Sequence, residues 1–120
     1  MSLLLLVDDE PAMGGLVAMS LERVGVRVVQ AATVEEAMSL SRQEQPRAIL
    51  LDLALGSEDG LSLLPRLKAD PVLSDVPVVA FSVHDSRREE AFRCGVAAFL
   101  AKPFDPPELR NVVLPLVSAS

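Results

Sequence analysis

The chain of 120 residues is near the commonest size for a single domain, and we expect one domain over residues 1–120. Half of the residues are hydrophobic, which argues against a disordered chain, and only 3% are aromatic, so the core must be aliphatic. The formal net charge of −6 repels phosphate backbones, so we expect no direct binding of this domain to nucleic acid.

The chain begins with a continuous apolar run over residues 3–7, which is typical of a strand buried on both faces of a sheet. Three acidic residues follow at once, so the run is too short to cross a membrane or to serve as a signal peptide. Pro11 suits the first turn of a helix. That helix is expected to reach about Val24, because Gly25 suits the position just after a helix end.

The next two strands are also short and apolar. Residues 26–31 predict the second strand, and Thr33 and Glu36 form a capping box for the helix that follows it. Pro46 follows the end of that helix, and residues 48–51 predict a third strand that leads directly into an aspartate.

A loop is expected over residues 54–59, between the third strand and a third helix that starts near Gly60. Pro65 lies inside this helical pattern, and we expect it to kink or shorten the helix. The fourth strand is expected over residues 76–81, and the fourth helix over residues 85–94.

Two residues near the fourth helix carry no clear chemical signal. His84 has no second histidine or cysteine at ligand spacing, so we expect an exposed loop residue. Cys94 is expected to be a small buried residue of the helix, which stops at Gly95. As the single cysteine, Cys94 has no partner for an internal disulfide, which fits a reducing, cytoplasmic location. The adjacent charged residues 87–90 are expected to form a solvated helix face.

The last unit contains a short strand and a final helix. Residues 98–101 predict the fifth strand, and Asp105 can cap a helix that begins with Pro106 and Pro107. Pro115 is expected to end or bend that helix. Strands that alternate with helices require parallel strands and right-handed crossovers. We therefore predict a flavodoxin-like, doubly wound α/β fold with five parallel strands in the order 2-1-3-4-5 and five helices.

Polar residues follow four of the five predicted strands. Asp8 and Asp9 follow the first strand, Asp52 the third, Ser82 the fourth and Lys102 the fifth. Ligands of doubly wound sheets bind beyond the carboxyl ends of the strands, where these four strands are neighbours in the predicted order. The five side chains are therefore expected to converge on one site.

The predicted carboxylate cluster favours a divalent cation. Three neighbouring carboxylates repel one another and raise each other's pKa, and a cation with hard oxygen ligands removes that conflict. Mg²⁺ suits such a site, because it binds one or two carboxylates and completes its coordination with water and phosphate oxygens. Lys102 and Ser82 then suit a phosphoryl group, as a point charge and a hydroxyl donor.

Each of these residues also has a simpler explanation. The acidic residues 8–10 precede a helix and would complement its dipole as caps. Asp52 would form a structural ion pair with Lys102, Ser82 would cap the fourth helix, and Phe99 would be an ordinary core residue. All of these explanations together require four coincidences at neighbouring strand ends, so we favour the common site.

Four motifs in chain order resemble those of the response regulator receiver family, and the resemblance covers essentially the whole chain. The motifs are Leu6-Val7-Asp8-Asp9-Glu10, Leu50-Leu51-Asp52-Leu53 with Asp59-Gly60, Phe81-Ser82, and Lys102-Pro103-Phe104. The resemblance implies that Asp52 is the phosphoacceptor. It also implies that Asp9, Asp52 and the Ala54 backbone carbonyl bind Mg²⁺ directly, and that Asp8 binds it through water.

The same resemblance gives roles to five further positions. Ser82 and Lys102 would bind the phosphoryl group, and Ser82 and Phe99 would form the conformational switch. The Lys102–Pro103 peptide bond is expected to be cis, a configuration that only about 5–6% of X–Pro bonds adopt. Val83 follows Ser82 and is expected to border the opening through which water and small phosphodonors reach the site.

The implied function is phosphoryl transfer to the protein itself in two-component signalling. A histidine kinase or a phosphotransfer protein would donate the phosphoryl group, and the chain would catalyse its own phosphorylation and dephosphorylation rather than act on other substrates. The face of the fourth helix, fifth strand and fifth helix would change, for an unidentified output partner or for a phosphorylation-dependent dimer. No membrane contact is expected.

This sequence departs from the family pattern at three positions. Gly56 stands where the family usually has proline, Val83 where it prefers alanine or glycine, and Pro65 is unusual inside the third helix. Two other function classes stay open at this point. One is a small Mg²⁺-dependent phosphohydrolase with the same carboxylates, and the other is a binding module that works without phosphorylation.

Overall fold

The structure is a computed structural model and describes residues 2–118. The strands of its main sheet are β1 (Ser2–Val7), β2 (Val26–Ala31), β3 (Ala48–Asp52), β6 (Val78–Ser82) and β7 (Ala98–Ala101). Its α-helices are α1 (Pro11–Glu22), α2 (Val34–Glu44), α3 (Leu63–Lys68), α4 (Arg88–Arg93) and α5 (Pro106–Ser118). Shorter elements are β4 (Ala54–Leu55), β5 (Glu58–Asp59) and the 3-10 turns η1 (Gly60–Ser62) and η2 (Asp85–Arg87).

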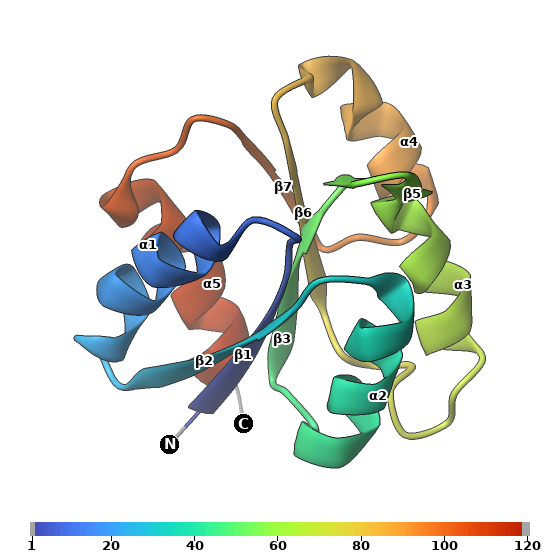
Figure 1. Cartoon of the computed structure of the whole chain (residues 1–120), viewed down its shortest axis with the longest axis horizontal. Helices are drawn as coiled ribbons and strands as arrows, with labels where there is room; N and C mark the ends of the chain where they lie inside the picture. The colour runs from blue at the N-terminus through green and yellow to red at the C-terminus, as the bar shows by residue number, and fades with distance from the viewer. Residues whose placement is uncertain (1, 119–120) are drawn as a thin grey trace.

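Within residues 2–118, the main sheet has five strands in the order β2-β1-β3-β6-β7, and all neighbouring strands are parallel. This is the predicted order, and the doubly wound, flavodoxin-like α/β fold is confirmed. Helices cover both faces of the sheet: α1 and α5 lie on one face, and α2, α3 and α4 lie on the other (Figure 1).

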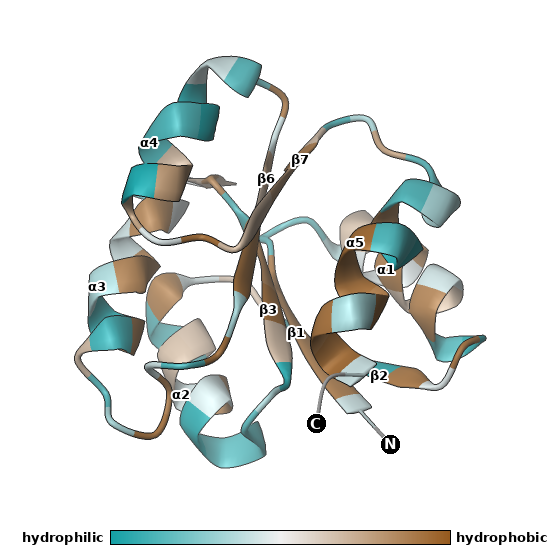
Figure 2. Ribbon diagram, turned by 180° about the vertical axis from the view of Figure 1, so that it is seen from behind, coloured by the Kyte–Doolittle hydropathy of each residue, from teal (hydrophilic) through white to brown (hydrophobic). Residues whose placement is uncertain are grey.

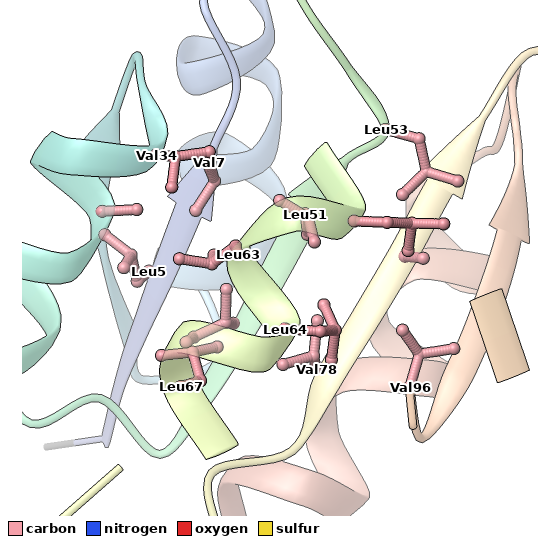
Figure 3. Packing of buried hydrophobic residues seen from close by; sticks show 14 of the residues in the cluster. Leu5, Val7, Val34, Leu51, Leu53, Leu63, Leu64, Leu67, Val78 and Val96 are labelled. Carbon is pink, nitrogen blue, oxygen red and sulfur yellow. The ribbon is translucent and has the colours of Figure 1, made fainter. Parts of the chain in front are cut away.

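The sheet divides the core into two hydrophobic clusters. In β1, Leu5 and Val7 belong to the cluster beneath α2, α3 and α4, whereas Leu4 and Leu6 belong to the cluster beneath α1 and α5. Successive side chains of a strand point to opposite faces, so the continuous apolar run supplies both clusters. Figure 3 shows leucines of α3, including Leu63, packed over β3 and β6 in the first cluster.

The helices differ in how much hydrophobic surface they carry. Viewed from behind, α2 and α4 show broad hydrophilic stretches, whereas α5 is largely hydrophobic (Figure 2). Leu109, Val113 and Val117 of α5 are buried in the second cluster. Glu89 and Glu90 of α4 are exposed, as expected for a solvated face. No helix within residues 2–118 is both long and apolar enough to cross a membrane.

The segment after β3 differs from the predicted loop. Ala54 and Leu55 pair antiparallel with Asp59 and Glu58, so residues 54–59 form a small hairpin. Gly56 lies in its turn with φ of 58°, a conformation that glycine adopts without strain. Proline fixes φ near −65°, so this turn would not accommodate the proline that is usual in the family.

The third, fourth and fifth helices are confirmed, but their extents differ from the predicted ones. The third and fourth begin as the 3-10 turns η1 and η2, so α3 and α4 are short. Pro65 lies in the first turn of α3, where a missing N–H costs no helical hydrogen bond. Of the two expectations for Pro115, that it ends or bends the last helix, the first is wrong, because α5 continues past it to Ser118.

The prediction that Cys94 is buried is also wrong, because the thiol is exposed. Ala91 is the buried residue of α4, and Cys94 lies just beyond the last turn of that helix. The chain reverses at Gly95, with φ of 102°, and this reversal leaves Cys94 on the solvent side.

The two ends of the described chain lie side by side. Ser2 Oγ donates a hydrogen bond to the Val117 carbonyl at 3.0 Å, which joins the start of β1 to the end of α5. Because β1 begins here, this contact lies at the amino ends of the strands, opposite the edge where the predicted site residues are found (Figure 1).

Candidate functional site

The carboxyl ends of β1, β3, β6 and β7 place the predicted polar residues at one edge of the sheet. Asp52 is opposite Phe81 in the register of β3 and β6, and Ser82 is opposite Ala101 in that of β6 and β7. The Lys102 backbone N–H donates to the Ser82 carbonyl at 2.8 Å, which fixes the exit of β7 beside β6. The strands therefore end at similar levels, and their terminal side chains meet.

The three aspartates form one cluster. Carboxylate oxygens of Asp8, Asp9 and Asp52 all lie within 4.8 Å of one another. Asp8 and Asp52 are buried, whereas Asp9 is exposed. Two buried carboxylates and an exposed one at this spacing form a set of hard oxygen ligands that is open to solvent on one side.

The buried charge of the Asp8 carboxylate is only partly compensated by its neighbours. Its Oδ1 accepts a hydrogen bond from the Glu10 N–H at 2.9 Å, but its buried Oδ2 has no hydrogen-bond partner within residues 2–118. Burial raises the pKa of Asp8 from 3.8 to about 6, and the neighbouring negative charge of Asp52 adds to this effect. The residues present therefore fit a divalent cation, which would neutralise the buried charge.

The hydrogen bonds do not support the alternative in which the acidic residues cap a helix. Glu10 occupies the N-cap position of α1, and its side chain makes no capping hydrogen bond. The Asp8 carboxylate accepts from Glu10 itself rather than from the first turn of α1. Capping therefore does not account for three consecutive acidic residues at this position.

Lys102 lies against the carboxylates. Its Nζ is 3.2 Å from Asp52 Oδ2 and 4.0 Å from Asp8 Oδ2, and it also lies 4.7 Å from the centre of the Phe81 ring. The other oxygen of Asp52, Oδ1, accepts a hydrogen bond from the Ala54 N–H at 3.0 Å. The Lys102–Pro103 peptide bond is cis.

A cavity of about 280 Å³ opens beside Asp52. Its lining includes Asp52, Ser82, Val83, Arg87 and Lys102. The buried Ser82 hydroxyl accepts a hydrogen bond from the backbone of the residue two positions on, at 3.1 Å, so its own proton remains available to a further acceptor. Val83 is 63% exposed at the opening of this cavity.

Two residues considered in the sequence analysis, Phe99 and His84, lie outside the cluster of carboxylates. Phe99 is only 7% exposed and belongs to the core cluster beneath α2, α3 and α4. The Arg88 guanidinium of α4 lies 5.7 Å from the centre of the Phe99 ring. His84 is exposed, as expected. Phe99 therefore already points inward here, and it connects β7 to α4.

Two residues of the site region were not recognised from the sequence. The charged run of residues 87–90 predicts a solvated helix face, but the Arg87 guanidinium donates to both carboxylate oxygens of Asp59, at 3.1 and 2.9 Å. These bonds hold the pKa of Asp59 below its usual range. One signal in the sequence could have marked Arg87 as a residue of the site region. It follows Ser82 by five residues and lies where the fourth helix begins.

Gln30, near the end of β2, holds the backbone of the acidic segment through two hydrogen bonds. Its Nε2 donates to the backbone carbonyls of Asp8 and Glu10, at 2.7 and 3.0 Å. Gly14 of α1 leaves room for this side chain, because a Cβ at Gly14 would overlap the Gln30 amide oxygen. No sequence motif marks Gln30, because its partners are main-chain atoms.

The fold and the site define a class of protein: a flavodoxin-like α/β domain with aspartates, a serine and a lysine at the carboxyl ends of its strands. The family model of the response regulator receiver domain matches residues 4–114, and the chain belongs to that family. The protein is therefore a receiver domain of two-component signal transduction, as the sequence motifs indicated.

Curated relatives are identical to this chain at about a third of the aligned positions. It is 35% identical over 108 residues to the DNA-binding dual master transcriptional regulator RpaA of Synechocystis, covering 88% of this chain and 45% of RpaA. It is 34% identical to an uncharacterized 14.6 kDa protein of Leptolyngbya boryana, covering 92% of this chain and 86% of that protein. It is 35% identical to the response regulator Rre1 of Synechocystis, covering 96% and 51%. The chain thus spans about half the length of RpaA and Rre1.

Solved receiver structures superpose closely on this chain. The receiver domain of the sensor histidine kinase PA1611 of Pseudomonas aeruginosa has a TM-score of 0.87 and 28% identity, with 98% of each chain covered. That structure has a magnesium ion coordinated in its active site cleft. The receiver domain of NtrX from Brucella abortus has a TM-score of 0.87 and 30% identity, with 98% of this chain and 99% of that chain covered.

Proposed function

We propose that this receiver domain accepts a phosphoryl group on Asp52 in a Mg²⁺-dependent reaction. The observation that carries the proposal is the surroundings of Asp52, because its carboxylate lies beside two other carboxylates, a lysine 3.2 Å away and a cavity. The donor is a phosphohistidine on a histidine kinase or a phosphotransfer protein, and the same residues later support loss of the group to water.

Asp9, Asp52 and the Ala54 carbonyl are the proposed direct ligands of Mg²⁺, and Asp8 binds through water. When bound, the ion supplies positive charge that stabilises the phosphoryl oxygens during transfer. Asp9 suits direct coordination because it is exposed at the open side of the cluster. Asp8 suits a water-mediated role because its buried Oδ2 is 4.0 Å from Lys102 and needs a further donor.

The β4–β5 hairpin supports the assignment of the Ala54 carbonyl. Leu55 and Glu58 flank the two-residue turn, so they form the hydrogen-bonded pair of the hairpin. Pairs alternate along an antiparallel ladder, so Ala54, which lies opposite Asp59, is in a non-hydrogen-bonded pair. The Ala54 N–H donates to Asp52, and the carbonyl of an extended residue points the same way as its N–H. That carbonyl is thus left free to bind a cation on the Asp52 side.

In the transfer step, an Asp52 carboxylate oxygen bonds to phosphorus while the bond from phosphorus to the histidine nitrogen breaks. The histidine ring keeps the electron pair, and Asp52 becomes an acyl phosphate. Lys102 is already 3.2 Å from Asp52 and transfers its hydrogen bond to a phosphoryl oxygen. In the hydrolysis step, water bonds to phosphorus, inorganic phosphate leaves, and the Asp52 carboxylate is restored.

Signalling follows from the new charge on Asp52. The Ser82 hydroxyl can donate its proton to a phosphoryl oxygen, which moves the segment between β6 and α4. Phe99 belongs to the core cluster and lies close to Arg88 at the start of α4, so the movement reaches the face of α4, β7 and α5. Since Phe99 is already buried, we place the response in its packing against α4 rather than in an inward turn.

The lengths of the relatives bear on the output partner. RpaA is named as a DNA-binding regulator and is about twice as long as this chain, so we propose that this receiver controls a separate output domain or protein. A phosphorylation-dependent dimer through α4, β7 and α5 is one way to do so. The exposed free thiol of Cys94 fits the reducing cytoplasm in which such kinases act.

Mass measurement after incubation with acetyl phosphate tests the proposal. We expect a phosphoryl adduct in the presence of Mg²⁺ and little without it, and no adduct in Asp52→Asn. An adduct that persists in Asp52→Asn would refute the assignment.

A second experiment tests the metal ligands. Asp9→Asn is expected to weaken Mg²⁺ binding at least roughly tenfold, because one direct ligand is lost. The exposed Glu89→Gln is the matched control, and amide NMR follows the titration.

A further inference from the structure

Arg87 joins two segments that border the proposed phosphorylation site. It lies directly before α4 and donates through both terminal nitrogens to Asp59 of β5, at 3.1 and 2.9 Å. Its Nε donates to Glu90, one turn further along α4, at 3.0 Å. The hairpin after β3 and the start of α4 are therefore connected through a single guanidinium.

The same side chain forms part of the wall of the cavity beside Asp52. Arg87, Ser82 and Lys102 all line this cavity, whose volume is about 280 Å³. Lys102 enters from the segment after β7, and Arg87 enters from the start of α4. A phosphoryl group on Asp52 would thus lie between two cations that come from different elements.

The present partners of Arg87 are exposed to solvent and carry one negative charge each, so a more highly charged group can compete with them. The Arg87 and Asp59 side chains are 28% and 52% exposed, and the Glu90 side chain is 48% exposed. Water screens ion pairs with this much exposure, although the two-pronged bond to Asp59 makes this pair stronger than a single contact would be. A phosphoryl group carries about two negative charges at neutral pH, and a guanidinium binds it through two parallel hydrogen bonds.

We propose that Arg87 is a second phosphoryl-binding cation, which leaves Asp59 for the phosphoryl oxygens when Asp52 is phosphorylated. This inference rests on the proposed phosphorylation of Asp52. The exchange removes the connection between the β4–β5 hairpin and α4, and it draws the start of α4 toward the site. Arg87 is then a positioning element of the switch as well as a ligand of the phosphoryl group.

Two substitutions separate this role from that of a simple structural ion pair. Arg87→Gln removes the cation, whereas Asp59→Asn removes only its competitor. An asparagine at 59 can still accept the Leu61 N–H that Asp59 Oδ1 accepts at 3.1 Å, so the start of η1 remains capped. If the ion pair were only structural, both substitutions would break it and would act in the same direction.

The measurement is the affinity for beryllofluoride, a phosphoryl mimic, at saturating Mg²⁺, followed by amide and arginine side-chain NMR. We expect Arg87→Gln to weaken binding roughly tenfold and Asp59→Asn to tighten it roughly threefold. In the parent, the Arg87 Nε–H signal is expected to shift on binding. Arg42→Gln is the matched control, because Arg42 pairs with Asp70 away from the cavity and is expected to leave the affinity unchanged.

Equal affinities of the parent and Arg87→Gln would overturn this inference alone, as would weakening by both substitutions. If Arg87→Gln fails to fold, Arg87→Lys takes its place: it keeps the charge but loses the two-pronged geometry, and a smaller loss is expected. No beryllofluoride response in the parent would instead refute the phosphorylation of Asp52, and this inference with it.

Discussion

Among single residues, Asp8 shows how the site opposes the stability of the fold. Its pKa in the folded protein is about 6, above the ordinary 3.8, so the folded state binds the proton more tightly than the unfolded chain does. The stabilisation from this proton is complete below pH 4 and is lost as the pH rises through 6. At pH 7.5 the buried charge therefore destabilises the domain when no metal is bound.

Asp8→Asn is expected to stabilise the metal-free domain at pH 7.5 by roughly 1–3 kcal/mol, because the amide carries no buried charge. Asparagine can also still accept the Glu10 N–H. Urea unfolding in the presence of a chelator, at pH 4.5 and 7.5, measures the effect. The gain should shrink at the lower pH and when Mg²⁺ is added to both proteins. Equal stability of the two proteins at pH 7.5 would contradict the prediction.

Val83 is expected to control the access of water and small phosphodonors to Asp52. It is 63% exposed and lines the cavity beside Asp52, so it has little packing to lose. A β-branched side chain there restricts the approach of water, because it has few rotamers with which to move aside. Val83→Ala is expected to speed dephosphorylation several-fold and to leave the free energy of unfolding within about 0.5 kcal/mol.

Dephosphorylation time courses at saturating Mg²⁺ test this expectation. Labelling by acetyl phosphate should also become faster in Val83→Ala, whereas Mg²⁺ affinity should stay the same. An unchanged or slower rate of hydrolysis would remove Val83 from the control of access. A large loss of stability would show instead that Val83 acts by packing against α4.

At the scale of elements, the sequence predicted the strands and the five-helix pattern because each depends on local signals. Continuous apolar runs, the capping box at Thr33 and Glu36, and glycines after helices are all visible in a single segment. Thr33 does accept the Glu36 N–H, at 3.1 Å. Antiparallel pairing within residues 54–59 was not predicted, because two-residue strands show no periodicity. The position of Arg87 depended on that hairpin, so its role was missed as well.

Gly56 is the residue on which the hairpin depends. Gly56→Ala is expected to cost roughly 1–2 kcal/mol, because φ of 58° is strained for residues with a Cβ. Gly56→Pro should open the turn and weaken Mg²⁺ binding as well, since the Ala54 carbonyl depends on the register of the hairpin. Thermal unfolding and a Mg²⁺ titration measure the two effects. Gly15→Ala, on an open face of α1, is the control that should cost nothing.

At the scale of the whole molecule, Phe99 is the expected connection between the site and the face of α4, β7 and α5. Phe99→Leu keeps the core filled but removes the ring that packs near Arg88, and its cost in stability should stay under about 1.5 kcal/mol. We expect beryllofluoride to bind with near-parent affinity while the amide shifts on α4 and β7 become smaller. A full parent-like response on α4 would exclude Phe99 from the switch.

The convergence of the site residues could be predicted from the sequence because it follows from the order of parallel strands. Asp8, Asp52, Ser82 and Lys102 need only the rule that ligands bind beyond strand carboxyl ends. The contacts of Gln30 could not be predicted, because they depend on the distance between β2 and the backbone after β1. The exposure of Cys94 likewise depends on where the chain reverses after α4.

The hydrogen bond between Ser2 and Val117 joins the two ends of the described chain at the edge of the sheet opposite the site. Both ends of the described chain emerge together, on the side away from the aspartates, so a protein fused at either end need not approach the proposed phosphorylation site. Because its two ends lie close together, the domain is also suited to insertion into a surface loop of another protein. A short linker could also join the two ends, and the chain could be reopened at the exposed Gly25 without disturbing the site.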